Sequence, residues 1–494
     1  MKKFLSLVLV LAVAAGSSFA SCSSAVDEGL AGVVDTQNQS LGLQNFQVEN
    51  SFNIWMNPAQ VTEWKTVYAE VLNANTWGGA NFRIPSGHLG VFVGRPYTGA
   101  ANGFADVTSV GNIRALTNNP QTLNLTANNI ADNMAPLAIT NNNIDIIYGL
   151  QMGSNMSLGF RLSMADNSSD QSASYQNPDG LGSDSTLGDG TVSLKRATSE
   201  IQIGAGALLK QVGPFQKLDV ALTIAMPKVD NKYTQSRIET SNTTDKETAT
   251  DELKANNSAN IGLLARGIMD MGGKKLFTTV GFVSADASSK RSTYADDTPT
   301  ATGLDLNKEI TYNDKTTSII LDAAMHTTPA KPFKVVYTAG IRSTSRTNEI
   351  LETDLSLGRG AAAGTLTGPF CYEKEEINTL TIPISVAVEH QTWSKVCTRI
   401  GVQRDFYSKT TTKTLYHNFR DIDAIADADG GTTRDEADVD TSNEVTTNPN
   451  TQPATVTMGI GIVPAENFDI DIAIVTGAYA FNNLISRASI RYHF

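Results

Sequence analysis

The chain ends in RASIRYHF, residues 487–494, and this stretch decides the fold class. Apolar and polar residues alternate along it, and Ile490, Tyr492 and the terminal Phe494 belong to the apolar set. An alternation with a period of two places the two sets on opposite faces of a β-strand. The sequence therefore predicts a final strand with one apolar and one polar face, which closes on an aromatic residue.

The same alternation recurs upstream in stretches of roughly ten to fourteen residues. Clear examples are 216–226, 377–390 and 467–476. Short turns, most of them with Gly or Pro, join these stretches in pairs, as at 153–155 and 464–466. Connections of this kind close β-hairpins, so the pattern predicts an array of antiparallel hairpins.

Long polar segments rich in Asn, Thr, Ser, Asp and Gly separate the hairpins, and we expect them to be loops. They cover about 166–196, 228–256, 288–314, 347–376 and 408–453. Short turns on one side and long loops on the other are typical of a transmembrane barrel. We therefore predict an all-β fold, a transmembrane antiparallel β-barrel of about 14 strands over residues 87–494, with short periplasmic turns and long extracellular loops. A further hairpin within 66–84 would make 16 strands, and a secreted β-sandwich or propeller is the alternative fold.

The composition agrees with a barrel and excludes other classes. The chain has 494 residues and a net charge of -12, so it lacks the basic face that a nucleic-acid partner requires. Beyond Ala15 no apolar run approaches the ~18 to 20 residues of a membrane-spanning helix. A barrel needs only one apolar face per strand, because lipid replaces the core on its outside, and this fits a hydrophobic fraction of 40%.

The N-terminus has the features of an export signal. Lys2 and Lys3 precede an apolar stretch that ends at Ala15, and we expect cleavage after Ala20, so that 1–20 is a signal peptide. The residues before Cys22 resemble a bacterial lipobox, so lipidation of that cysteine is an alternative. Residues 21–86 precede the first clear strand, and we expect them to form a periplasmic segment or a plug inside the lumen.

Two motifs resemble features of known families. Asn57-Pro58-Ala59, ahead of the expected barrel, resembles the N-terminal tripeptide of the long-chain fatty-acid transporter family of outer-membrane proteins. This resemblance implies that the tripeptide belongs to a hatch and that hydrophobic substrates leave sideways through the wall. The C-terminal strand resembles the signature that the barrel-assembly machinery recognises, which implies an assembly signal in Ile490, Tyr492 and Phe494, and outer-membrane lipid as a partner.

Charged residues of both signs occupy the face of the strands that is expected to point into the lumen. They are Arg161, Glu200, Asp219, Arg266, Asp322, His326, Lys334, Arg342, Glu389, Arg399, Asp469, Asp471 and Arg491. They could line a water-filled pore and set its charge selectivity, as rings of charge do in channels. They could instead pair across strands and brace the barrel, and the sequence leaves both interpretations open.

An acidic segment and two cysteines give no functional site. Asp427, Asp429, Gly430 and Glu436 match four positions of a calcium loop, but the first position would be Ile425, so we expect a solvated acidic loop and no metal. Cys371 and Cys397 should lie at opposite ends of the barrel and remain free thiols.

The five histidines, His88, His326, His390, His417 and His493, are scattered, and no catalytic arrangement stands out. We therefore expect neither an enzyme nor a cofactor.

The favoured function is an outer-membrane channel for passive, porin-like diffusion of a small solute that the sequence does not identify. One alternative is a plugged channel for hydrophobic compounds, similar to the fatty-acid transporters. The other is a surface or adhesive protein that the barrel anchors. The sequence determines neither the substrate nor the oligomeric state.

Overall fold

The computed structural model of the protein describes residues 36–72, 75–97, 136–175, 187–239, 246–255, 258–296, 306–354, 368–418, 441–447, 454–475 and 487–494. In this part of the chain, four short helices precede the strands. The helices are α3 (Thr36–Leu41), η1 (Asn45–Gln47), α4 (Asn53–Met56) and η2 (Pro58–Thr62). The strands are β1 (Thr66–Leu72), β2 (Asn75–Ile84), β3 (Gly87–Val93), β4 (Ile144–Met152), β5 (Met156–Tyr175), β6 (Leu187–Val212), β7 (Phe215–Glu239), β8 (Lys246–Ala255), β9 (Asn260–Asp270), β10 (Lys275–Asp286), β11 (Ser289–Asp296), β12 (Leu306–Ala330), β13 (Phe333–Asp354), β14 (Gly368–Trp393), β15 (Val396–Asn418), β16 (Thr441–Thr447), β17 (Thr455–Ala465), β18 (Phe468–Val475) and β19 (Arg487–His493).

The strands form one antiparallel sheet that closes on itself. The first strand, β1, pairs with β2 on one side and with β19 on the other. Three wall positions are each occupied by two segments, because β8 and β9 both lie along β7, β10 and β11 along β12, and β16 and β17 along β15. The nineteen segments therefore make a closed barrel of 16 strands. The predicted fold class, an all-β antiparallel barrel, is confirmed.

The predicted count of 14 strands is wrong, and the alternative of 16 is confirmed. Residues 66–84 form the hairpin β1–β2, and Val67 of β1 stands opposite Tyr492 of the last strand. The barrel therefore begins at Thr66, whereas the sequence analysis placed its start at residue 87. The second strand of the hairpin is hard to recognise from the sequence because Gly78 and Gly79 interrupt its apolar alternation.

An apolar belt surrounds the outside of the barrel at the end with the short turns. On β7, Val220 and Met226 face outward and are more than two-fifths exposed, whereas Asp219 and Ala221 face inward and are buried. The inner face of the wall is thus polar where the outer face is apolar. This alternation is expected for a strand that separates lipid from a polar interior. A closed barrel with such a belt belongs to the bacterial outer membrane, where short turns mark the periplasmic side.

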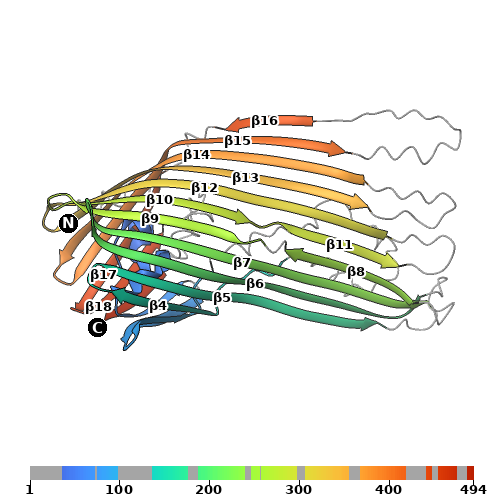
Figure 1. Ribbon diagram of the computed structural model, residues 1–494, viewed down its shortest axis with the longest axis horizontal. Helices are drawn as coiled ribbons and strands as arrows, with labels where there is room; N and C mark the ends of the chain where they lie inside the picture. The colour runs from blue at the N-terminus through green and yellow to red at the C-terminus, as the bar shows by residue number, and fades with distance from the viewer. Residues whose placement is uncertain are drawn as a thin grey trace.

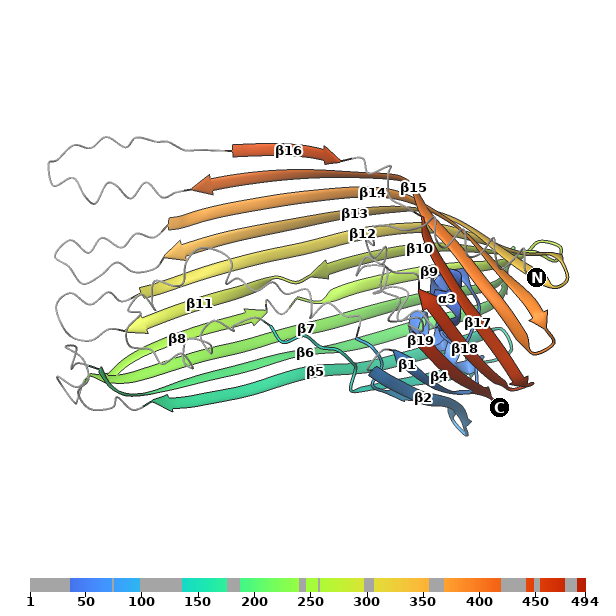
Figure 2. The ribbon, with the colours of Figure 1, turned by 180° about the vertical axis from the view of Figure 1, so that it is seen from behind.

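Beyond the belt the wall is tall on one side and short on the other. Strands β6 and β14 have 26 residues each, whereas β18 has 8 and β19 has 7. Figure 1 shows β5 to β8 and β11 to β16 reaching far past β4, β17 and β18, and Figure 2 shows the short strands of the opposite wall from behind.

Much of the sequence predicted as long loops is strand in the tall wall. On β7 the outward residues after Met226 are polar, such as Lys228 and Lys232, while Val229 and Tyr233 face inward and are buried. The apolar and polar faces therefore exchange sides above the belt. Sequence analysis used the outward apolar face to recognise strands, and this signal ends where the lipid ends, although the backbone pairing of the sheet continues.

Residues 36–65 lie inside the lumen, and we call them the plug. Its helix α3 packs against β15, β17 and β18, and η2 packs against β4, β5 and β6 on a distant part of the wall. Figure 2 shows these helices within the ring of strands. Within the described residues, no helix has the length and apolar character needed to cross a bilayer. The plug takes only the first part of the segment 21–86 that was expected to precede the barrel.

The main hydrophobic cores lie between the plug and the wall. In one of them, Phe52 and Trp55 of the plug pack against Tyr68, Trp77 and Phe92 of β1 to β3. The Trp55 and Phe92 rings meet edge to face with their centroids 4.8 Å apart. Two other clusters join further plug residues to β9, β10 and β12 to β14. The barrel is therefore packed around its plug, as a soluble domain is packed around its core.

The belt predicts a contrast between two positions on the outer face of β7. Leu222→Arg places a charge in the middle of the apolar stretch 218–226, which should destabilise the barrel by about 2–4 kcal/mol. The control Thr234→Arg lies on the same face above the belt and should change stability little, because it remains in water. Urea unfolding of the barrel in lipid vesicles measures both. Equal losses of stability at the two positions would show that the membrane boundary is misplaced.

Candidate transport site

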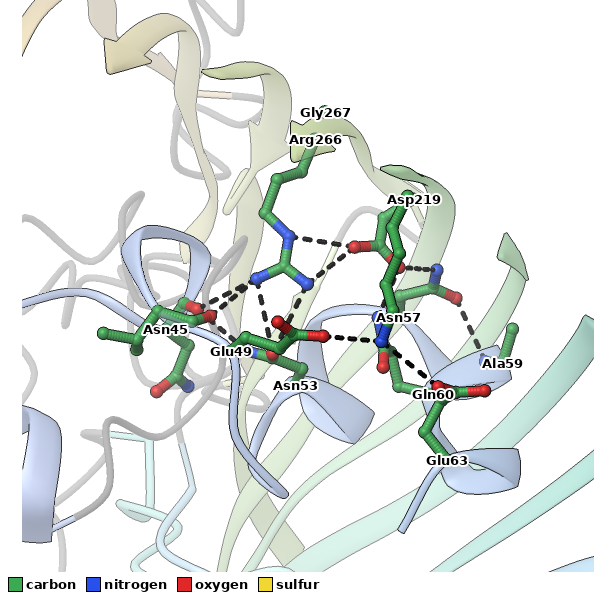
Figure 3. Close-up of polar contacts among 12 residues, drawn as sticks. Asn45, Glu49, Asn53, Asn57, Ala59, Gln60, Glu63, Asp219, Arg266 and Gly267 are labelled. Carbon is green, nitrogen blue, oxygen red and sulfur yellow. Dashed lines mark hydrogen bonds and ion pairs between the residues drawn. The ribbon is translucent and has the colours of Figure 1, made fainter. Parts of the chain in front are cut away.

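An ion pair between two wall residues, Arg266 and Asp219, is hydrogen-bonded to the plug (Figure 3). The two residues are cross-strand partners on β9 and β7, and both side chains are fully buried. The Arg266 guanidinium donates to Asp219 Oδ2 from Nε at 2.9 Å and from Nη2 at 2.6 Å. Its Nη1 donates to the carbonyl oxygen of Val48, in the plug, at 2.7 Å. Because a buried charge requires hydrogen bonds as well as a counter-charge, the plug completes the environment of this pair.

The Asn57-Pro58-Ala59 tripeptide binds the same carboxylate from the plug side. Asn57 is buried and caps η2, because its Oδ1 accepts a hydrogen bond from the Ala59 backbone N–H at 3.0 Å. Its Nδ2 donates to Asp219 Oδ1 and to the carbonyl oxygen of Ala207, both at 2.9 Å. Pro58 stands at the first helical position, where its missing N–H costs no hydrogen bond. The tripeptide thus fixes the start of η2 against the wall.

A row of glycines on the wall receives this part of the plug. Gly149, Gly159 and Gly206 are direct cross-strand neighbours on β4, β5 and β6. A Cβ on Gly159 would lie closer than 3.0 Å to the backbone of Pro58 and Ala59. A Cβ on Gly149 or on Gly206 would lie equally close to side chains of the plug. The row therefore allows the plug backbone to lie directly on the sheet.

A second glycine contact supports α3 on the opposite part of the wall. A Cβ on Gly401 of β15 would lie closer than 3.0 Å to the carbonyl of Leu41. A Cβ on Gly459 of β17 would lie closer than 3.0 Å to the side chain of Ser40. The plug is thus seated at two separate places on the wall, and both depend on the absence of a side chain.

Ion pairs connect the plug to the wall near the periplasmic end. Lys217 donates to Glu49 at 2.5 Å and to Glu63 at 3.1 Å, and Lys275 donates to Glu49 at 3.1 Å. Burial alone would raise the pKa of the Glu49 carboxyl, but the two lysines outweigh it and hold the pKa below its ordinary value. Glu49 is therefore ionised at neutral pH and attracts both lysines.

The residues predicted to face the lumen all do so. They are Arg161, Glu200, Asp219, Arg266, Asp322, His326, Lys334, Arg342, Glu389, Arg399, Asp469, Asp471 and Arg491. Several of them bond to the plug: Arg161 donates to the carbonyl oxygen of Trp55, while Gln47 donates to Asp322 at 3.0 Å and contacts His326 through its carbonyl oxygen. Others form ion pairs with one another along the wall. Their function as pore-lining residues stays a prediction.

Sequence analysis missed several buried ion pairs, and two of them lie close to the plug or the first strands. Glu70 of β1 accepts hydrogen bonds from Thr36 and Tyr68 and pairs with Arg487 at 2.6 Å. Arg95 forms a two-pronged pair with Asp145, with distances of 2.9 and 2.8 Å. Glu70 and Asp145 were detectable as single acidic residues on the inward face of alternating segments. Arg95 follows the end of β3, where the alternation carries no information.

The residues of the proposed assembly signal lie on the outside of the barrel. Ile490, Tyr492 and Phe494 are each about half exposed, and the last two rings stack with centroids 6.3 Å apart. Arg487 and Arg491 face inward and are buried, so the predicted facing of this strand is confirmed. Recognition by the assembly machinery stays a prediction.

The other sequence patterns have different outcomes. Cys397 is a free thiol at the periplasmic end of β15, and the register places the backbone of Cys371 at the far end of β14. The signal peptide 1–20, Cys22 and the acidic segment with Asp427, Asp429, Gly430 and Glu436 lie outside the described residues. Among the residues that are described, no group of three or more His, Cys, Asp or Glu side chains is placed to hold a metal ion.

Two of the cavities between the plug and the wall lie next to each other. The first, of about 230 Å³, is lined by Gln37, Asn38, Leu41, Val48, Glu49, Asn50, Lys275, Phe277, His326, Lys334, Val336, Ala387 and Glu389. The second, of about 280 Å³, is lined by Gln37, Pro332, Lys334, Glu389, Gln391, Ser394, Lys395, Val396, Cys397, Arg399, Gly461, Ile462, Val463, Asp469, Asp471 and Arg491. Both lie near the periplasmic turns, and they share Gln37, Lys334 and Glu389.

No known protein family and no curated protein matches the sequence. Among solved structures, the open form of the ferric-catecholate import receptor Fiu from E. coli K12 is 9% identical with a TM-score of 0.25, over 87% of this chain and 81% of that chain. The FrpB iron transporter from Neisseria meningitidis (F3-3 variant) is 8% identical with a TM-score of 0.24, over 88% and 83% of the two chains. The translocator domain of the autotransporter NalP, also from Neisseria meningitidis, is 12% identical with a TM-score of 0.23, over 75% and 94%.

TM-scores this low assign neither a family nor a function to the chain. The resemblance to the long-chain fatty-acid transporter family is not shown by these comparisons.

The buried pair predicts a large stability effect. Asp219→Ala leaves the Arg266 guanidinium buried without its counter-charge and should cost about 3–5 kcal/mol of unfolding free energy. The control Glu252→Ala breaks the pairs with Lys232 and Lys254 on the outer surface and should cost less than about 1 kcal/mol. Urea titration followed by tryptophan fluorescence gives both values. If the Asp219 variant lost no more than the control, the pair would not anchor the plug.

The glycine row predicts that one methyl group can displace the plug. Gly159→Ala sets a Cβ against the backbone of η2, so a protease should cut within 36–65 faster while the barrel stays folded. The control Gly204→Ala lies on the same inner surface, where the nearest atom to a new Cβ, in Arg161, is 3.3 Å away. It should leave the cleavage rate close to that of the wild type. Unchanged cleavage in the Gly159 variant would contradict the proposed seat.

Proposed function

We propose that the protein is an outer-membrane channel for the passive diffusion of small solutes, and that these solutes pass beside the plug. The observation that carries the proposal is the pair of cavities between the plug and the part of the wall that runs from β10 to β19. Each is more than tenfold larger than the ~10–15 Å³ that one water requires, and polar groups line both. These two cavities support a route for small polar molecules that opens at the periplasmic end of the plugged barrel.

A wide, open lumen is not part of this proposal. A barrel of 16 strands is large enough to leave an aqueous channel. In this protein the plug fills that space, and buried pairs such as Arg266–Asp219 hold it in place. The porin-like function is therefore proposed in a restricted form, in which the plug limits the size of the solute.

A channel for hydrophobic compounds is the second candidate. The first cavity favours it, because Leu41, Val48, Phe277, Val336 and Ala387 give that cavity an apolar side. The same cavity is also lined by Glu49, Lys275, Lys334 and Glu389, and most of the residues that line the second cavity are polar or charged. A long apolar chain would have to cross this charged region to reach the periplasm, so we favour small polar solutes.

Planar-bilayer recording of the purified full-length protein tests the proposal. We expect small, steady conductance steps from the wild type and Gly204→Ala, and larger steps from Gly159→Ala, because displacing the plug widens the route. Silence from all three folded proteins would overturn the channel and favour a barrel that anchors surface segments. If vesicles with the protein accelerate the transfer of a labelled fatty acid but not of small polar solutes, the second candidate is correct.

A further inference from the structure

Five side chains of alternating charge form a continuous row along the wall of the second cavity. Lys334 pairs with Glu389 at 3.1 Å, and Glu389 pairs with Arg399 at 2.7 Å. Arg399 and Arg491 then each pair with Asp471 at 2.5 Å. The row crosses the wall from β13 to β19, and we call these five residues the charge row.

A glycine allows the row to cross a strand. Arg399 lies on β15 and Asp471 on β18, with β17 between them. Gly461 of β17 stands opposite both Cys397 and Asp471 in the sheet, and a Cβ there would lie 2.6 Å from Arg399 Nη2. The absence of a side chain at Gly461 thus leaves the space through which the guanidinium reaches the carboxylate.

The charge row also passes the point where the two cavities meet. Lys334 and Glu389 line both cavities, together with Gln37 of the plug. At the other end of the row, Arg491 donates to Gln37 Oε1 at 3.3 Å. A solute that moves from one cavity to the other therefore has to pass the Lys334–Glu389 pair.

We propose that the charge row is a binding site for small zwitterions, molecules with one ammonium and one carboxylate group, and that it selects them as they pass the plug. This inference rests on the proposed channel function. A ring of one charge sign attracts ions of the opposite sign and rejects the rest. In the charge row, cationic and anionic side chains alternate at distances of a few ångströms. A zwitterion can place its carboxylate beside Lys334 and its ammonium beside Glu389 at once, whereas a simple ion gains only one of these two contacts.

Cys397 provides a native reporter for binding. Its thiol is partly exposed, lines the second cavity and lies 3.9 Å from Glu389 Oε2. The full-length protein in detergent is treated with N-ethylmaleimide, which is uncharged, and the peptide that contains Cys397 is quantified by mass spectrometry. Glycine should slow the labelling of Cys397 several-fold, whereas acetate, methylammonium and acetamide at the same concentration should have little effect. Equal protection by all four, or by none, would overturn the proposal.

Two opposite substitutions test the electrostatic basis in bilayers. Under a salt gradient the wild type should show only a small reversal potential, because the three cationic and two anionic side chains of the row differ by a single charge. Glu389→Gln should shift the reversal potential toward anion preference and Lys334→Gln toward cation preference, and each should reduce the protection by glycine. Glu252→Gln, on the outer surface, is the matched control and should change neither measurement.

The outcomes separate this inference from the channel itself. Conductance without protection by glycine, or shifts of the same sign in both variants, would leave the channel standing and reject the zwitterion site. Protection by glycine in a protein that does not conduct would support the binding site and reject the proposed function. Strong ion selectivity in the wild type would show that one charge sign dominates the passage, and it would also reject the zwitterion site.

Discussion

The pairing of β1 with β19 is the constraint on which the rest of the structure depends. Inside a bilayer no water is available for the backbone, so each N–H and C=O of the wall must find a partner in the next strand. A sheet satisfies this requirement without an edge only when its first and last strands meet, as they do from Thr66 to Leu72. Closure with 16 strands then encloses a lumen that is wider than wall side chains alone can fill. The plug fills that lumen, and the polar side chains on the inner face of the wall determine how the plug is held.

A plug in a polar lumen is held in a different way from the core of a soluble domain. It buries aromatic residues such as Trp55, but it also has to satisfy wall charges that point inward from the lipid-facing strands. Arg266 obtains part of its hydrogen bonds from plug carbonyls, and Asp219 obtains part of its own from Asn57. Neither partner is satisfied without the other, so plug and wall form one structure. The glycine row brings the two backbones close enough for these bonds to form.

The sequence predicted the wall better than its contents. Alternation identified most strands and the inward facing of Asp219 and Arg266, because facing depends only on parity along one strand. It misplaced the upper ends of strands such as β6 and β7, since the exchange of apolar and polar faces above Met226 removes the signal while the ladder continues. It could not show that Asn57 meets Asp219, which is 162 residues away in the chain. Such contacts depend on how the wall closes around the plug, and no local pattern encodes that closure.

The placement of the cavities follows from how the wall charges are satisfied. On the side of β5 to β9, charged wall residues bond to the plug, as Arg161 does to Trp55 and Arg266 to Val48, so the two surfaces must touch. From β13 to β19 the charges of the row are satisfied mainly by one another. A wall that supplies its own counter-charges does not need the plug to cover it, and space can remain there without leaving a buried charge unpaired. A polar passage is thus least costly beside the charge row, which is where both cavities lie.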